Sequence, residues 1–160
     1  MSFAFSEESE AGFQALLKRY PKEQRMAALI PTLYLVQDQE GHLSLDSMRY
    51  VAERLEVPPS QVLNTATFYT LLRKEPVGRF HLQVCTNVSC YLRGSDELLD
   101  VIRDKCGISP GEVSDDRVFS CEEVQCLAAC ECAPAMQVNW DYHEGLTPES
   151  LAELVDKLRE

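Results

Sequence analysis

The sequence predicts an α+β protein in which a small helical bundle, residues 1–76, precedes a mixed α/β domain, residues 77–160. Three observations predict this division. Apolar residues in the first half recur every three or four positions, as on one face of a helix. From Phe80 onward they alternate, as in a strand. Between the two halves, Glu75-Pro76-Val77-Gly78 interrupts both patterns.

Two helices are predicted before residue 42. Ser6 can cap the first, since glutamates follow it in the first turn. Pro21 is well placed to begin the second, and Pro31 should kink it because proline lacks an N–H and crowds the preceding turn. Gly41 should end that helix. The two apolar faces consist of Phe13, Leu16, Leu17 and Tyr20, and of Met26, Leu29, Ile30 and Leu33.

Two more helices complete the predicted bundle. Ser44 can cap the third, with Leu45, Met48, Ala52 and Leu55 facing inward. The segment Pro58-Pro59-Ser60 breaks the chain, and the apolar residues after it predict a fourth helix. Two helices joined by a short break could form a DNA-binding motif. The absence of a basic face in the sequence favours a plain helical bundle.

The second half predicts strands and helices in the order β-α-β-β-β-α. Residues 80–84 alternate as a strand, and Ser95 should cap a helix that ends at Gly107. Residues 118–125 predict a second strand. Residues 135–138 and 140–142 predict a hairpin that turns near Asn139. Thr147-Pro148-Glu149 is a helix start, and Leu151, Leu154 and Leu158 should face inward.

Four of the seven cysteines form two pairs at predicted strand ends. Cys85 and Cys90 are separated by four residues, Cys126 and Cys130 by three, and 35 residues lie between the pairs. Loops at the ends of neighbouring strands can converge, and four thiolates bind either zinc or an iron–sulfur cluster. Zinc ribbons usually use two-residue gaps. The longer gaps favour a [2Fe–2S] cluster with one iron on each pair.

Alternatives to this ligand set stay open at this point. The four thiols could be buried core residues, or they could bind zinc and stabilise an interaction module. Cys106 should only pack. Cys121 and Cys132 are alternative ligands, although Cys121 falls within a predicted strand and Cys132 precedes the next one. A thiol–disulfide enzyme is disfavoured because no C-x2-C pair is present.

Composition limits the compartment and the partners. The formal net charge is −11, of which residues 79–160 carry most, with 7 basic and 16 acidic side chains. Such a surface repels nucleic acid and anionic lipid, and favours a more basic protein partner. The start of the chain resembles neither a signal nor a transit peptide, and the longest apolar run is too short to span a bilayer. Clustered cysteines then indicate metal or redox chemistry in a reducing cytoplasm.

Two cysteine segments carry a family resemblance. These segments resemble the thioredoxin-like [2Fe–2S] ferredoxins. They are Val84-Cys85-Thr86-Asn87-Val88-Ser89-Cys90 and Val124-Gln125-Cys126-Leu127-Ala128-Ala129-Cys130, the second followed by Ala133-Pro134. The helical first half, with Ala66-Thr67-Phe68-Tyr69, is similar to the E subunits of bacterial NADH:quinone oxidoreductase, respiratory complex I. The resemblance covers nearly the whole chain, and the β-α-β-β-β-α order agrees with a thioredoxin-like unit.

The resemblance implies an electron-transfer subunit with one [2Fe–2S] cluster on Cys85, Cys90, Cys126 and Cys130. It implies a partner subunit that binds FMN and NADH, contacts with other peripheral-arm subunits, and a place on the cytoplasmic face of the membrane without insertion into it. The chain itself would bind no NADH. The equivalent subunit of an NAD-linked hydrogenase or formate dehydrogenase is the alternative. One position departs from the family: Ala128 stands where glycine is usual, and alanine would be strained there if φ is positive.

Overall fold

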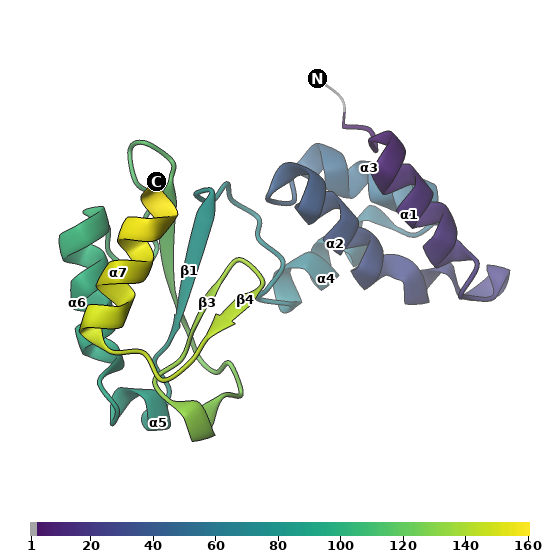
Figure 1. Ribbon diagram of the computed structural model, residues 1–160. Helices are drawn as coiled ribbons and strands as arrows, with labels where there is room; N and C mark the ends of the chain where they lie inside the picture. The colour runs from purple at the N-terminus through teal and green to yellow at the C-terminus, as the bar shows by residue number, and fades with distance from the viewer. Residues whose placement is uncertain (1–2) are drawn as a thin grey trace. The chain divides into compact units, whose positions relative to one another are not determined.

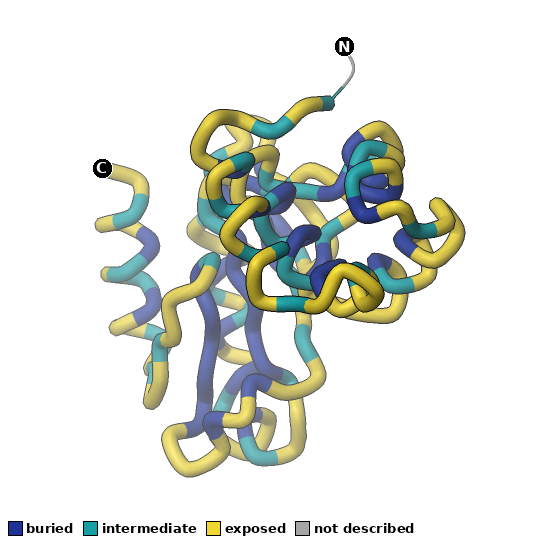
Figure 2. Tube along the Cα trace, turned by 90° about the vertical axis from the view of Figure 1, so that its right-hand side faces the viewer, coloured by how far each residue is buried: buried dark blue, intermediate teal, exposed yellow. Residues whose placement is uncertain are grey.

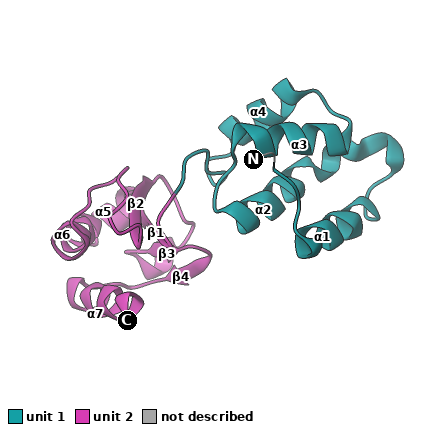
Figure 3. Ribbon diagram, turned by 90° about the horizontal axis from the view of Figure 1, so that it is seen from above, with its two compact units in different colours: residues 1–76 teal, residues 77–160 magenta. Residues whose placement is uncertain are grey.

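The computed structural model describes residues 3–160, which belong to two compact units, residues 1–76 and 77–160 (Figures 1 and 3). Unit 1 contains α1 (Glu7–Leu17), the 3-10 helix η1 (Lys22–Ala28), α2 (Leu29–Glu40), α3 (Leu45–Leu55) and α4 (Pro59–Phe68). Unit 2 contains a four-stranded sheet and three α-helices. In the described residues, every helix is too short or too polar to cross a bilayer.

The ends of the unit 1 helices follow from local chemistry. The hydroxyl oxygens of Ser6 and Ser44 accept hydrogen bonds from the N–H groups of Ser9 and Ser47, both at 3.1 Å, which caps α1 and α3 as predicted. Gly41 ends α2 at φ 77°, a left-handed conformation that glycine adopts without strain. The predicted helix starts and stops in this unit are therefore largely confirmed.

Three details of the unit 1 prediction were wrong, the first being Met26, which was assigned to an apolar helix face but is 37% exposed. Pro31 does not kink a helix: it is the third residue of α2, where no N–H is required, and the non-helical residue lies earlier, at Gln24 within η1 (φ −121°, ψ 38°). Leu45 is 62% exposed because it lies in the first turn of α3, outside the core. The core of the unit instead includes Val51, which is fully buried.

Unit 2 is built on a sheet with the order β2-β1-β3-β4. Strand β1 (Phe80–Cys85) pairs in parallel with β2 (Phe119–Val124) and antiparallel with β3 (Met136–Val138), which forms a hairpin with β4 (Asp141–His143). Asn139 takes φ 55° in the predicted turn. The helices are α5 (Val88–Tyr91), α6 (Ser95–Cys106) and α7 (Pro148–Arg159), and a short 3-10 helix, η2, spans Cys130–Cys132.

The helices α6 and α7 pack against one face of the sheet (Figure 1). Leu82, Val84 and Met136 point to this face and are fully buried, as the two-residue period of a strand requires. Figure 2 shows long buried stretches of the tube in the strands of the sheet. Thr147 caps α7 with a capping box, which confirms the predicted helix start, and Leu151 is fully buried beneath it. Unit 2 therefore has the mixed arrangement of helices and strands that the sequence predicts.

Two predictions in unit 2 need correction. Ser95 is not the cap of α6: Gly94 precedes the helix at φ 92°, and the buried Ser95 hydroxyl has no hydrogen-bond partner in the described residues. The loop after Cys85 also contains the four-residue helix α5, which the sequence pattern did not predict.

Candidate metal centre

The four predicted ligands lie on two loops that leave the same edge of the sheet. Strands β1 and β2 are parallel and in register, with Cys85 opposite Val124. The loop that carries Cys90 follows one strand, and the loop that carries Cys126 and Cys130 follows the other (Figure 1). Because parallel strands end at a common edge, both pairs of thiols emerge at one end of unit 2.

Backbone and side-chain hydrogen bonds hold the two loops together. The amide of Asn87 donates to the carbonyl oxygen of Gln125 at 2.7 Å, and its Oδ1 accepts from Val88 N–H, also at 2.7 Å. The N–H of Thr86 donates to Val124 at 3.1 Å. Asn87 therefore caps α5 and also ties the first loop to the second. Sequence analysis did not assign this role, although asparagine before a short helix is a recognisable cap signal.

The two pairs differ in burial. Cys85 and Cys90 are 3% and 2% exposed, in a small apolar cluster with Leu127, Ala129, Ala133 and Ala135. Cys126 and Cys130 are exposed. A group held between the pairs would be shielded from water on the side of the first pair and accessible on the side of the second.

The Cys90 thiol lies close enough to Cys85 and Cys130 for both to affect its pKa. Burial raises the pKa of the Cys90 thiol, a hydrogen bond with Cys85 and the charges of Cys85 and Cys130 raise it further, and a hydrogen bond from the backbone of Ala135 opposes them. Cys126 accepts a hydrogen bond within its own loop, from Ala128. Over residues 3–160, no three His, Cys, Asp or Glu side chains gather tightly enough for a single-ion site.

Ala128 adopts φ 58°, so the residue that departs from the family pattern is in the left-handed region. This conformation costs a non-glycine residue about 1–2 kcal/mol. It also directs the Ala128 N–H to Cys126 Sγ at 3.2 Å. The expected strain at this position is present, and it accompanies a hydrogen bond to a predicted ligand.

The remaining cysteines lie elsewhere or differ in environment. Cys121 points into the core between the sheet and the helices, and burial raises its pKa to about 12. Cys106 is half-buried beside that core. Cys132 is exposed two residues beyond Cys130, and the carboxylate of Glu144 raises its pKa. Cys121 lies within β2 and its side chain faces the core, so it does not lie on either of the two ligand loops.

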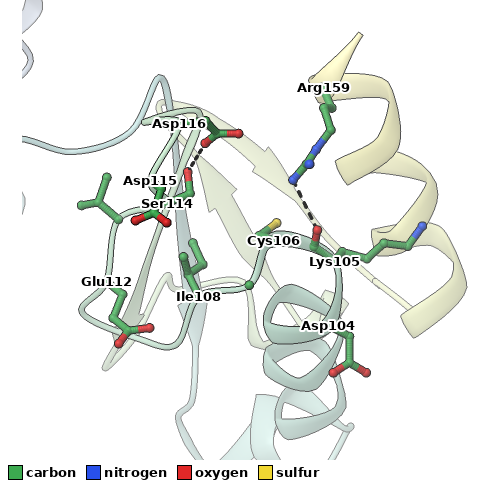
Figure 4. A pocket seen from close by; sticks show the side chains of 11 residues that line it. Asp104, Lys105, Cys106, Ile108, Glu112, Ser114, Asp115, Asp116 and Arg159 are labelled. Carbon is green, nitrogen blue, oxygen red and sulfur yellow. Dashed lines mark hydrogen bonds between the residues drawn. The ribbon is translucent and has the colours of Figure 1, made fainter.

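A cavity of about 770 Å³ lies at the opposite end of the sheet (Figure 4). It is bordered by Cys106, Ser114, Asp116 and Arg159, and Arg159 donates a hydrogen bond to the carbonyl oxygen of Lys105 at 3.3 Å. Burial raises the pKa of Cys106. None of the four predicted ligands borders this cavity, so it is not part of the candidate metal centre.

Comparisons with known proteins agree with the cysteine pattern. The family model described as thioredoxin-like [2Fe–2S] ferredoxin matches residues 13–159. The E subunit of NADH-quinone oxidoreductase from Rickettsia bellii (strain RML369-C) is 42% identical over 159 residues, covering 99% of this chain and 95% of that one. The E 2 subunit of NADH-quinone oxidoreductase from Rhizobium meliloti (strain 1021) is 44% identical over 146 residues, covering 91% and 86%.

Among solved structures, the NAD⁺-reducing [NiFe]-hydrogenase in the air-oxidized state matches with a TM-score of 0.73 and 20% identity. This match covers 88% of the present chain and 24% of the hydrogenase chain, and it shows a shared fold. The family match extends over both units and includes all seven cysteines. The chain belongs to the thioredoxin-like [2Fe–2S] ferredoxin family.

Proposed function

We propose that this chain is an electron-transfer subunit that carries one [2Fe–2S] cluster near the flavin of the NADH-oxidising module of NADH:quinone oxidoreductase. The observation that carries the proposal is the 42% identity to an E subunit of that oxidoreductase over 99% of the chain, which extends across the helical unit as well as the ferredoxin-like unit. A free ferredoxin would have no need of the helical unit. The chain would thus be one component of an oxidoreductase.

The residues at the loop edge fit such a cluster. The donor set is four thiols in two pairs, which suits a group with two metal centres, and Cys85, Cys90, Cys126 and Cys130 are the proposed ligands. When bound, the cluster would accept and release one electron. The apolar side chains of Leu127 and Ala135 would exclude water from one side. The N–H of Ala128 stabilises negative charge on Cys126 Sγ, which favours the reduced state.

The partners follow from the same proposal. NADH and FMN would bind to a neighbouring subunit, and this chain would have no NADH site and no catalytic residue of its own. Other peripheral-arm subunits would contact it, and the assembly would lie at the cytoplasmic face of the membrane. Residues 1–76 and 77–160 would act as two domains, one for assembly and one for electron transfer.

Two alternatives are less well supported. The NAD⁺-reducing hydrogenase shares the fold with this chain, but 20% identity is too low to argue for a shared activity. The relatives that match over nearly the full length are E subunits of NADH-quinone oxidoreductase. A zinc-stabilised module is disfavoured by the family match over residues 13–159.

The test is metal analysis and electron paramagnetic resonance of the chain purified without oxygen. We expect two irons and two sulfides per chain and a one-electron signal after reduction with dithionite. Replacing any of the four proposed ligands by serine should abolish or alter the signal.

Cys132→Ser is the matched control for the exposed pair, and Cys121→Ser is the control for a buried thiol. Both should keep the iron content and the signal. Stoichiometric zinc in a colourless protein would reject the cluster, and loss of iron in the Cys132 variant without loss in the Cys130 variant would reject the ligand assignment.

A further inference from the structure

Unit 1 contains a cavity of about 370 Å³ at the turn between α1 and η1. Its charged lining residues are Lys18, Lys22 and Arg25, and no acidic residue lines it. This volume is at the lower end of the roughly 300–1,000 Å³ of small-molecule sites, enough for one or two side chains.

Two of the acidic groups near this cavity are already paired, and Glu23, next to Lys22 in the sequence, does not line it. Arg25 contacts Glu56 at 2.8 Å, and Glu10 is held by Arg54 at 2.6 Å. Within residues 3–160, Lys18 and Lys22 have no carboxylate at ion-pair distance, and both are exposed. Two ammonium groups therefore border the cavity without a partner from the described chain.

The rest of the wall is apolar. Leu17 and Tyr20 are half-buried and pack against the core of unit 1, and Pro21 completes this side. A well-matched occupant would place a carboxylate between the lysines and an apolar group against Leu17 and Tyr20. An aspartate or glutamate beside an apolar side chain has this character.

Tethering distinguishes a segment of a docked subunit from a free anion. A free small anion would be held only by the contacts at the cavity, and ion pairs with exposed lysines contribute little. A segment of a subunit already docked elsewhere on this chain binds more readily, because its effective concentration is set by the assembly. This step rests on the proposed function as one subunit of a complex.

We propose that this cavity receives an acidic segment of a neighbouring subunit of the same oxidoreductase. It would then act as an anchoring site on unit 1, separate in sequence from the cysteine loops of unit 2. Ion pairs at such a site are partly exposed, so their contribution should weaken as added salt screens them.

The first experiment compares two adjacent charge reversals in the intact complex. Lys18→Glu and Arg19→Glu change the charge equally, but Arg19 does not line the cavity. The complex is isolated through a tag on another subunit, and retention of this chain is measured by quantitative mass spectrometry at increasing NaCl. We expect about tenfold weaker retention for Lys18→Glu and for Lys22→Glu, and less than about twofold for Arg19→Glu. Equal loss in the Lys18 and Arg19 variants would overturn the proposal.

The second experiment identifies the occupant. The photo-cross-linker p-benzoylphenylalanine is placed at Gln14, which also lines the cavity, and the assembled complex is irradiated. The cross-linked peptide should contain aspartate or glutamate and come from a neighbouring subunit. Cross-links to a second copy of this chain, to its own residues 79–160, or to no peptide at all would overturn the proposal.

The paramagnetic signal of the same preparation shows whether a failed test counts against the anchoring site or against the proposed electron-transfer function. If the signal is present and the cavity tests fail, the anchoring site is wrong and the proposed function stands. If the unmodified chain neither joins the complex nor shows the signal, the proposed function itself fails.

Discussion

Replacing Arg54 by methionine should lower the free energy of unfolding of unit 1 by about 2 kcal/mol at pH 7. The guanidinium of Arg54 binds both carboxylate oxygens of Glu10, at 2.6 and 2.7 Å, and lies 4.6 Å from the centre of the Phe13 ring. It thereby ties the start of α1 to α3. Methionine keeps much of the apolar stem and removes the charge and the hydrogen bonds.

The magnitude follows from two contributions. Hydrogen bonds from Arg54 and, to a lesser extent, from Gln14 lower the pKa of Glu10 from 4.5 to about 2, so the share of Arg54 is below the roughly 3.4 kcal/mol that the whole shift represents. The Glu10 side chain is 37% exposed, so solvent screening reduces this to about 1–1.5 kcal/mol. The cation–π contact with Phe13 adds about 0.5–1 kcal/mol.

The pH dependence has a definite sign. Because the folded-state pKa of Glu10 is lowered, its contribution is fully present above pH 4.5 and is lost as the pH falls toward 2. More than half of the carboxylate contribution should be gone by about pH 3. The contact with Phe13 does not depend on that carboxylate, so part of the effect of Arg54→Met should persist in acid.

The assay is urea unfolding of the full chain, followed by the circular dichroism of the helices. Fluorescence of Trp140, the one tryptophan, reports unit 2 separately. A double-mutant cycle with Glu10→Gln gives the coupling energy at pH 7 and pH 3. Arg49→Met is the matched control on α3, since its contact with Asp46 is exposed and should contribute under about 0.5 kcal/mol. An Arg54 variant as stable as the Arg49 variant, or a coupling energy unchanged at pH 3, would refute this reasoning.

Three further predictions concern unit 2. Ala128→Gly should stabilise the chain by about 0.5–1 kcal/mol in urea unfolding, since glycine relieves the strain at φ 58°; destabilisation would contradict the strain. Asn87→Ala should cost about 1 kcal/mol and speed iron loss to a chelator, because it removes the contact with Gln125; an unchanged release rate would show that the contact does not hold the loops. Gly78→Ala should lower stability by more than about 2 kcal/mol by Trp140 fluorescence, because a Cβ would lie 2.4 Å from the Phe119 backbone, and wild-type stability would contradict this close approach.

Features encoded by a few neighbouring residues were predictable from the sequence. The caps at Ser44 and Thr147 and the stop at Gly41 depend on local hydrogen bonds and on glycine's freedom, and they lie where predicted. The strands themselves also follow from their alternation, whereas their parallel pairing was not predicted and comes from the structure. Their pairing brings the two cysteine loops to one edge of the sheet.

Features that depend on distant packing were not predictable in the same way. Leu45 has the period of an inward residue, but it is the first residue of α3 and is 62% exposed, whereas Met48, three residues later, belongs to the core. Asn87 contacts Gln125 across 38 residues of sequence, and such a contact becomes visible only when the sheet is formed. The assignment of Cys85, Cys90, Cys126 and Cys130 as ligands remains a prediction that the iron analysis will test.

The parallel register of β1 and β2 means that geometry, rather than the number of intervening residues, fixes the distance between the cysteine pairs. Cys85 stands beside Val124 whatever length of chain joins the strands. The exposed turn at residues 115–117, at the far end of the sheet, could therefore accept inserted residues while the ligand loops keep their places. Homologues should be recognised by the short gaps within each pair, and searches that fix the long gap between pairs will miss genuine members.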